Sequence, residues 1–244
     1  MTNDQAFPAA LRPVRLKDHL SFTALAMLAL LAMYSLLRLA LLVYNREQIG
    51  GASFNDLLEA FGNGLRFDLR LTIWAAVPLL LALLSPAAMR LRRAMVVWLT
   101  LWASVTLFLG LIELDFYHEF NQRLNGLVFQ YLQEDPKTVG SMLWYGFPVL
   151  RYLLAWALGT GLMYWLFRRF DRLFRADDAT RAAASRLPLR LAVLALCLGL
   201  ALLGHRGTLR QGPPLRWGDA FTTTSVFANQ LGLNGTLSLV AAAS

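Results

Sequence analysis

Hydrophobic residues of this chain collect in five long blocks separated by short polar stretches. The blocks cover residues 20–44, 71–88, 94–112, 147–167 and 187–204. A helix of about 18 or more mostly apolar residues is long enough to cross the hydrocarbon layer of a membrane. The second and fifth blocks are short, so each must recruit its flanks or thin the bilayer locally. The pattern predicts an all-α membrane protein with a five-helix transmembrane domain over residues 1–204.

The polar stretches contain weaker helical signals. Apolar residues from Phe54 to Phe61 recur at i, i+3, i+4 and i+7, which predicts an amphipathic helix lying on the membrane surface. Gly62 and Gly64 are expected to end this helix before the second block begins. Residues 205–244 are polar, irregular and rich in Gly and Pro, with weak amphipathicity from about Ser225. We expect this last segment to be a periplasmic linker.

Charge indicates the orientation. Segments 1–19, 87–94 and 168–190 hold thirteen of the 23 Lys and Arg residues and five of the 15 Asp and Glu residues, so they carry the whole net charge of +8. Short loops rich in Lys and Arg stay in the cytoplasm. We therefore expect a cytoplasmic N-terminus and, after five spans, a periplasmic C-terminus. Since the arginines are loop anchors without a basic, aromatic-rich patch, no nucleic-acid partner is expected.

The stretch "LRFDLR" precedes the second block. Arg66, Asp68 and Arg70 alternate there with apolar residues. They could form an ion pair that orients the helix end, or Arg66 and Arg70 could bind a lipid phosphate. The spacing alone favours the ion pair. Arg38, near the outer end of the first block, is expected to extend its side chain to the interface.

A second polar stretch, "LIELDFYHEFNQRLNGLVF", continues the third block without a break. It presents Glu113, Asp115, His118, Glu119 and Arg123. Only Asp115 and His118 share a helical face well, and two ligands are fewer than a tight metal site needs. We therefore predict an interfacial helix with a hydrated face and no metal site, with Glu119 and Arg123 paired at i, i+4.

Three stretches together resemble a known family. They are "GLRFDLR", "ELDFYHEFNQRLN" and "RGTLRQGPPLRWGDA…FANQLGLNGT". In this order they resemble the membrane portion of lipoteichoic acid synthase-like proteins, in the form found in bacteria with an outer membrane. These proteins are phosphoglycerol transferases of the sulfatase and alkaline phosphatase superfamily. The resemblance covers nearly the whole chain.

The resemblance implies a protein of the bacterial inner membrane with five N-terminal helices, a linker and a large extracytoplasmic domain. That domain carries a threonine nucleophile and a divalent metal, often manganese. We expect this chain to lack the domain, to have no catalytic residue or cofactor of its own, and to be inactive alone. Thr222, Thr223 and Thr224 match the linker of the family and not its active site.

The implied function is a membrane-anchoring, lipid-headgroup-presenting module of a headgroup transferase in cell-envelope biogenesis. Its expected partners are membrane lipids and a sulfatase-type catalytic domain, in cis or in trans. The alternative is a stand-alone, non-enzymatic partner or scaffold of an envelope assembly. A transporter is disfavoured because the apolar blocks carry almost no charge. With the resemblance, the lipid-headgroup candidates become Arg66, Asp68, Arg70, Glu113, Asp115, Tyr117, His118 and Arg123.

Overall fold

The computed structural model describes residues 14–131, 133–174, 186–207 and 213–243, and in these ranges every regular element is a helix. Five helices are long and apolar enough to cross a membrane, as predicted. They are α1 (Leu16–Tyr44), α2 (Phe54–Leu81) with the 3-10 turn η3 (Ala82–Leu84), α4 (Arg92–Phe120), α7 (Val149–Leu173) and α8 (Leu187–Arg206). The chain is therefore a multi-pass membrane protein.

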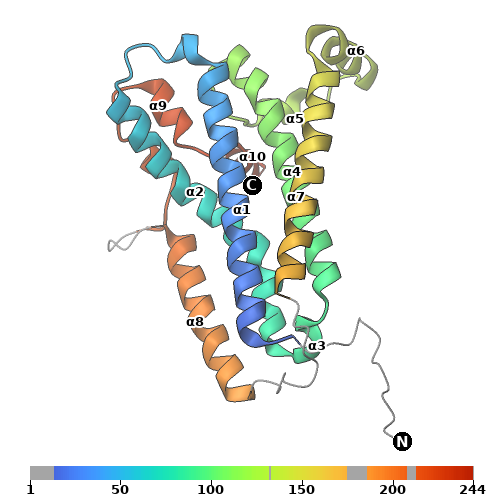
Figure 1. Cartoon of the computed structure of the whole chain (residues 1–244). Coiled ribbons are helices and arrows are strands. Elements are labelled where there is room, and N and C mark those ends of the chain that lie inside the picture. The colour runs from blue at the N-terminus through green and yellow to red at the C-terminus, as the bar shows by residue number, and fades with distance from the viewer. Residues whose placement is uncertain (1–13, 132, 175–185, 208–212, 244) are drawn as a thin grey trace, which may run out of the picture.

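The long helices run between two distinct ends of the molecule. α1 and α8 begin and α7 ends near the short helix α3 (Pro86–Met89), which defines the α3 end (Figure 1). α1 and α4 end and α7 begins near α6 (Pro136–Gly146), which defines the α6 end. α1, α2, α4 and α7 form the main bundle, and α8 packs along α2 at its side.

The predicted surface helix and the second predicted span are one continuous helix. α2 begins at Phe54 behind a capping box, in which Asp56 N–H donates to Ser53 Oγ at 3.2 Å and Ser53 N–H donates to Asp56 Oδ2 at 2.8 Å. The expected break at Gly62 and Gly64 is wrong. An added Cβ at Gly64 would overlap the guanidinium of Arg38, so this glycine lets α1 and α2 approach closely. The flank thus joins the helix and gives the short second block its length.

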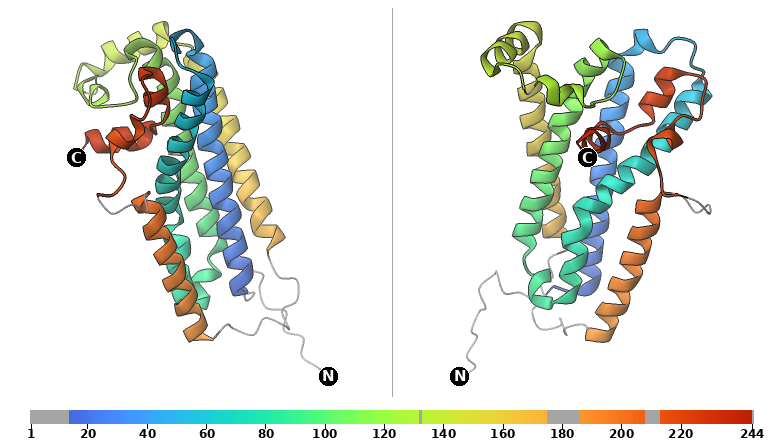
Figure 2. Two further views of the ribbon diagram at one scale, coloured as in Figure 1. Left: turned by 90° about the vertical axis from the view of Figure 1, so that its left-hand side faces the viewer. Right: turned by 180° about the vertical axis from the view of Figure 1, so that it is seen from behind.

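The C-terminal segment folds back onto the bundle. It contains η4 (Trp217–Ala220), α9 (Val226–Leu231) and α10 (Gly235–Ala242). These elements lie against the α6-end halves of α2 and α4, as both views of Figure 2 show. Phe227, Leu231 and Leu233 are fully buried there. The segment expected to be an irregular linker is part of the packed structure between residues 213 and 243.

Two layers of buried charge bound the apolar core. In the first layer, at the α3 end, Arg92 of α4 pairs with Asp171 of α7 at 3.2 Å, beside His19 of α1. In the second layer, Arg38 of α1 pairs with Asp68 of α2. His19 and Arg38 are 19 residues apart on α1, or about 28 Å at 1.5 Å per residue, close to the roughly 30 Å of a bilayer core.

Between the two layers the helices bury an apolar cluster. Its members include Phe22, Leu30, Leu71, Leu79, Leu99 and Phe167, which come from four of the long helices. Residues 20–37 of α1 and 94–112 of α4 contain no charged side chain. The hydrocarbon layer of the membrane therefore fits between the two charged layers, and the second layer lies at the boundary between hydrocarbon and headgroups.

Candidate functional site

The second charged layer is built around Arg38. Its Nη1 donates to Asp68 Oδ2 at 2.5 Å and its Nη2 donates to Asp68 Oδ1 at 3.0 Å, a bidentate pair. Asn234 Nδ2 donates to the same Oδ1 at 2.7 Å. Arg38 is 3% exposed and Asp68 is 0% exposed, so the expected extension of Arg38 to the interface is wrong. Asp68 also turns away from Arg66 and Arg70 and pairs with α1.

A second ion pair lies beside the first. α4 ends in a left-handed turn at Asn121 (φ 52°), which brings Arg123 back to face Glu113. Arg123 Nη1 donates to Glu113 Oε2 at 2.8 Å, and the predicted pair of Arg123 with Glu119 is wrong. Burial lowers the pKa of Arg123, while the Glu113 carboxylate opposes that change. The guanidinium stays charged, because an arginine side chain does not deprotonate in proteins.

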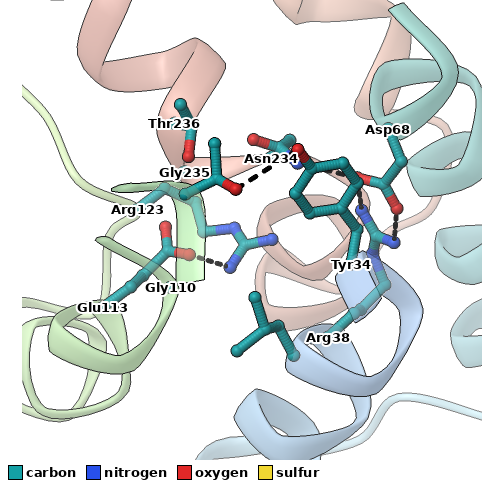
Figure 3. A pocket seen from close by; sticks show the side chains of 11 residues that line it. Tyr34, Arg38, Asp68, Gly110, Glu113, Arg123, Asn234, Gly235 and Thr236 are labelled. Carbon is teal, nitrogen blue, oxygen red and sulfur yellow. Dashed lines mark hydrogen bonds and ion pairs between the residues drawn. The ribbon is translucent and has the colours of Figure 1, made fainter. Parts of the chain in front are cut away.

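Both arginines also bind the backbone of the C-terminal segment. Arg38 Nε donates to the Leu231 carbonyl at 2.9 Å, and Arg38 Nη2 donates to the Leu233 carbonyl at 3.2 Å. Arg123 Nη2 donates to the same Leu233 carbonyl. Figure 3 shows the five side chains of this clamp network converging from α1, α2, α4, the turn after α4 and the C-terminal segment. They are Arg38, Asp68, Glu113, Arg123 and Asn234.

A small polar cavity lies inside the clamp network. Tyr34, Thr106 and Thr236 add further polar groups to its lining, and its volume is about 20 Å³. A space of this size holds about one water molecule. It is too small for a phosphate group, and the carboxylates of Asp68 and Glu113 already accept hydrogen bonds from the protein. The clamp network therefore ties the C-terminal segment to the bundle.

Two of the eight candidates face the end of α1, and a third, Tyr117, packs edge-to-face against Phe227 of α9. Asp115 Oδ1 accepts a hydrogen bond from the Tyr44 hydroxyl at 2.5 Å, and His118 Nδ1 lies 3.2 Å from Asn45 Oδ1. Glu113, Asp115 and Arg123 are buried, whereas His118 and Glu119 are exposed, so the expected hydrated face is wrong for three of its five residues. Within the described ranges, no three His, Cys, Asp or Glu side chains gather closely enough to hold a metal ion.

Arg66 and Arg70 lie elsewhere, on the face of α2 that meets the end of α8. Arg66 Nε and Nη2 donate to the Gly207 carbonyl at 2.9 and 2.7 Å. Arg70 Nη1 donates to the Leu215 carbonyl at 3.2 Å. Neither arginine forms an ion pair with a carboxylate of the described residues. The eight candidates thus lie in several separate places, and binding of lipid by any of them stays a prediction.

Two members of the clamp network, Arg38 and Asn234, were not among the candidates predicted from the sequence. Arg38 did carry a signal, because an arginine inside an apolar block usually has a buried partner. Asn234 carried none, since its contact with Asp68 joins residues 166 positions apart. Gly235 was missed as well: an added Cβ there would overlap the Glu113 carboxylate, so a glycine is needed for the C-terminal segment to approach α4.

Fold and site together define a five-helix membrane protein whose C-terminal segment is held against one end of the bundle by buried ion pairs. Comparison with protein-family models, with curated proteins and with solved structures gave no match.

Proposed function

We propose that this chain is the membrane module of a phospholipid-headgroup transferase of the sulfatase superfamily, acting in the bacterial inner membrane during cell-envelope biogenesis. The module anchors a sulfatase-type catalytic domain, in cis or in trans, and presents lipid headgroups to it. The divalent metal of the reaction, manganese in the family that the sequence resembles, belongs to that catalytic domain. In this proposal the α3 end, where the described parts of the basic segments lie, faces the cytoplasm, as the excess of arginine favours.

The observation that carries the proposal is the docking of the C-terminal segment. Arg38 and Arg123 donate to the carbonyls of Leu231 and Leu233, and Asn234 donates to Asp68. A polypeptide segment held by buried charged donors keeps a fixed position relative to the bilayer. A catalytic domain attached to this segment, or bound to it, is therefore held within reach of headgroups in the outer leaflet.

The coding sequence around the chain provides the first test. A sulfatase-type domain encoded in frame after codon 244, or in a neighbouring gene, is expected. If no such domain is found in either place, the module proposal is rejected in favour of the non-enzymatic scaffold.

The second test measures two activities of that catalytic domain, with and without residues 1–244. In vesicles containing phosphatidylglycerol, transfer of the phosphoglycerol headgroup leaves diacylglycerol, which can be quantified. We expect diacylglycerol release to require the module, whereas hydrolysis of a small soluble phosphodiester should not. Equal release of diacylglycerol with and without the module contradicts the proposal.

A further inference from the structure

The side chains between α2 and the last turn of α8 have an unusual hydrogen-bonding pattern around His205. Trp74 Nε1–H donates to His205 Nδ1 at 3.2 Å. Arg70 Nη2 lies 3.3 Å from His205 Nε2, on the other side of the ring. Both ring nitrogens therefore face a group that only donates, because neither an indole nor a guanidinium can accept a hydrogen bond.

A histidine ring cannot satisfy both neighbours. A neutral imidazole has one N–H donor and one acceptor nitrogen, and a protonated imidazole has two donors and no acceptor. If Nδ1 accepts from Trp74, the proton is on Nε2, and this N–H points at the N–H groups of Arg70. In this tautomer the Nε2–H of His205 and the Nη2 group of Arg70 are two donors that face each other at 3.3 Å.

Arg70 has hydrogen-bonding and charge-pairing capacity that the described residues do not use. Its Nε is buried and has no hydrogen-bond partner, and no carboxylate of the described residues pairs with its charge. By contrast, Arg38, Arg92 and Arg123 are each paired with a buried carboxylate. An unneutralised arginine next to an unpaired N–H is costly where water is scarce, and an anionic oxygen removes both costs.

The position of the cluster in the fold indicates where such an oxygen would come from. Arg70 follows Asp68 by two residues and so lies at the level of the second charged layer, at the edge of the apolar core. The Arg70 guanidinium lies 6.0 Å from the Trp74 ring centroid, a cation–π contact, and tryptophan is common at the membrane interface. Phosphate groups of lipids lie next to this boundary between hydrocarbon and headgroups.

We propose that Arg70 and His205 form a binding site for a phosphate oxyanion, supplied by a phospholipid headgroup or by free phosphate. The inference deepens the proposed function and rests on it for its biological role. One phosphate oxygen accepts from His205 Nε2–H and from the Nε and Nη2 groups of Arg70. Trp74 is a positioning residue: by donating to Nδ1, it keeps the proton on Nε2, where the anion needs it.

Binding to the purified full chain in detergent tests the site, with two probes measured separately by titration calorimetry. The probes are short-chain phosphatidylglycerol, which carries a phosphodiester, and inorganic phosphate. We expect saturable binding of phosphatidylglycerol that Arg70→Gln weakens by about tenfold or more, since it removes charge-assisted hydrogen bonds. Binding of inorganic phosphate at the same site would show that the phosphate alone suffices, and its absence would identify the lipid as the source.

Two further variants test whether binding depends on Arg70 in particular and on the tautomer of His205. Arg151→Gln removes an exposed arginine of α7 near the α6 end and should leave the affinity unchanged. Trp74→Phe keeps the packing and Arg70, but it frees Nδ1 to take the proton, so that Nε2 accepts from Arg70. This variant should bind about fivefold more weakly. The nitrogen shifts of His205 in histidine-labelled protein should move from the Nε2–H to the Nδ1–H tautomer.

The site is rejected if neither probe binds saturably, or if Arg70→Gln binds as tightly as the wild type. It is also rejected if Arg151→Gln weakens binding as much as Arg70→Gln does. These results are independent of the transfer assay. A chain that supports lipid turnover without binding either probe refutes the site alone, whereas binding without any effect of the module on turnover refutes the proposed function alone.

Discussion

Gly64 offers the sharpest test of the clamp network. An added Cβ at this position would overlap the guanidinium carbon and two of the guanidinium nitrogens of Arg38. Arg38 cannot move without losing its two hydrogen bonds to Asp68 and its contacts with the Leu231 and Leu233 carbonyls. We therefore expect Gly64→Ala to break the Arg38–Asp68 pair and to release the C-terminal segment.

The magnitude follows from two opposing effects. Separating a buried ion pair so that a charge is left without its partner costs about 3–5 kcal/mol, and Asp68 is fully buried. Replacing a helical glycine by alanine gains back about 0.5–1 kcal/mol through backbone entropy. The free energy of unfolding should therefore fall by about 2–4 kcal/mol in Gly64→Ala.

Gly62 provides a matched control on the same helix. A Cβ at Gly62 meets no atom within 4 Å, so Gly62→Ala should be stabilising by about 0.5–1 kcal/mol. Unfolding of both variants by sodium dodecyl sulfate in mixed micelles, followed by circular dichroism, gives the difference. Proteolysis within residues 213–243 should be faster in Gly64→Ala only. Equal unfolding midpoints and equal proteolysis rates for the two variants would refute the role of Arg38.

Other consequences can be measured separately. Ser53→Ala removes the capping box of α2 and should cost about 1 kcal/mol, measured by the same denaturation assay. Arg92→Gln separates the buried pair with Asp171 and should cost about 3–5 kcal/mol, again by denaturation; a loss below 1 kcal/mol would contradict the pairing. Hydrogen bonds from the Thr138 hydroxyl and amide lower the pKa of Asp135, which caps α6. The cap is therefore fully formed above the ordinary aspartate pKa. It is lost as the pH falls through the lowered pKa of Asp135. Amide hydrogen exchange at the start of α6 should therefore become less protected in acid, and Asp135→Asn should abolish that pH dependence.

The five spans could be predicted because a membrane helix must be apolar over a fixed length, and that requirement is visible in one dimension. The continuity of α2 was missed because two nearby glycines, Gly62 and Gly64, usually indicate a helix break. In the structure, Gly64 leaves room for the guanidinium of Arg38 to pack against α2. The docked C-terminal segment was missed because its Gly- and Pro-rich composition outweighed a few apolar residues. Phe227 and Leu231 show their role only when α1 and α2 supply the surface that buries them.

The candidate site was harder to predict because its partners are distant in the chain. Asp68 was expected to pair with its neighbours Arg66 and Arg70, but its partner is Arg38, 30 residues away on α1. Glu113 was identified correctly as an unusual residue, but its pairing with Arg123 depends on the left-handed turn at Asn121. Residue spacing on one helix cannot reveal pairs that a turn or a second helix creates.

Arg38 and Arg123 differ from Arg70 in how their charges are neutralised. Arg38 and Arg123 are neutralised by Asp68 and Glu113, so the surface on which the C-terminal segment docks has no net charge from these four residues. The segment contributes carbonyl oxygens and one amide, which suit a permanent contact inside a protein. Arg70 also donates to a carbonyl, that of Leu215, but it lacks a carboxylate partner among the described residues, and its Nη2 lies 3.3 Å from His205 Nε2. Arg38 and Arg123 therefore hold the fold. Arg70 is where we expect a bound anion, because a partly buried arginine without a carboxylate partner favours one.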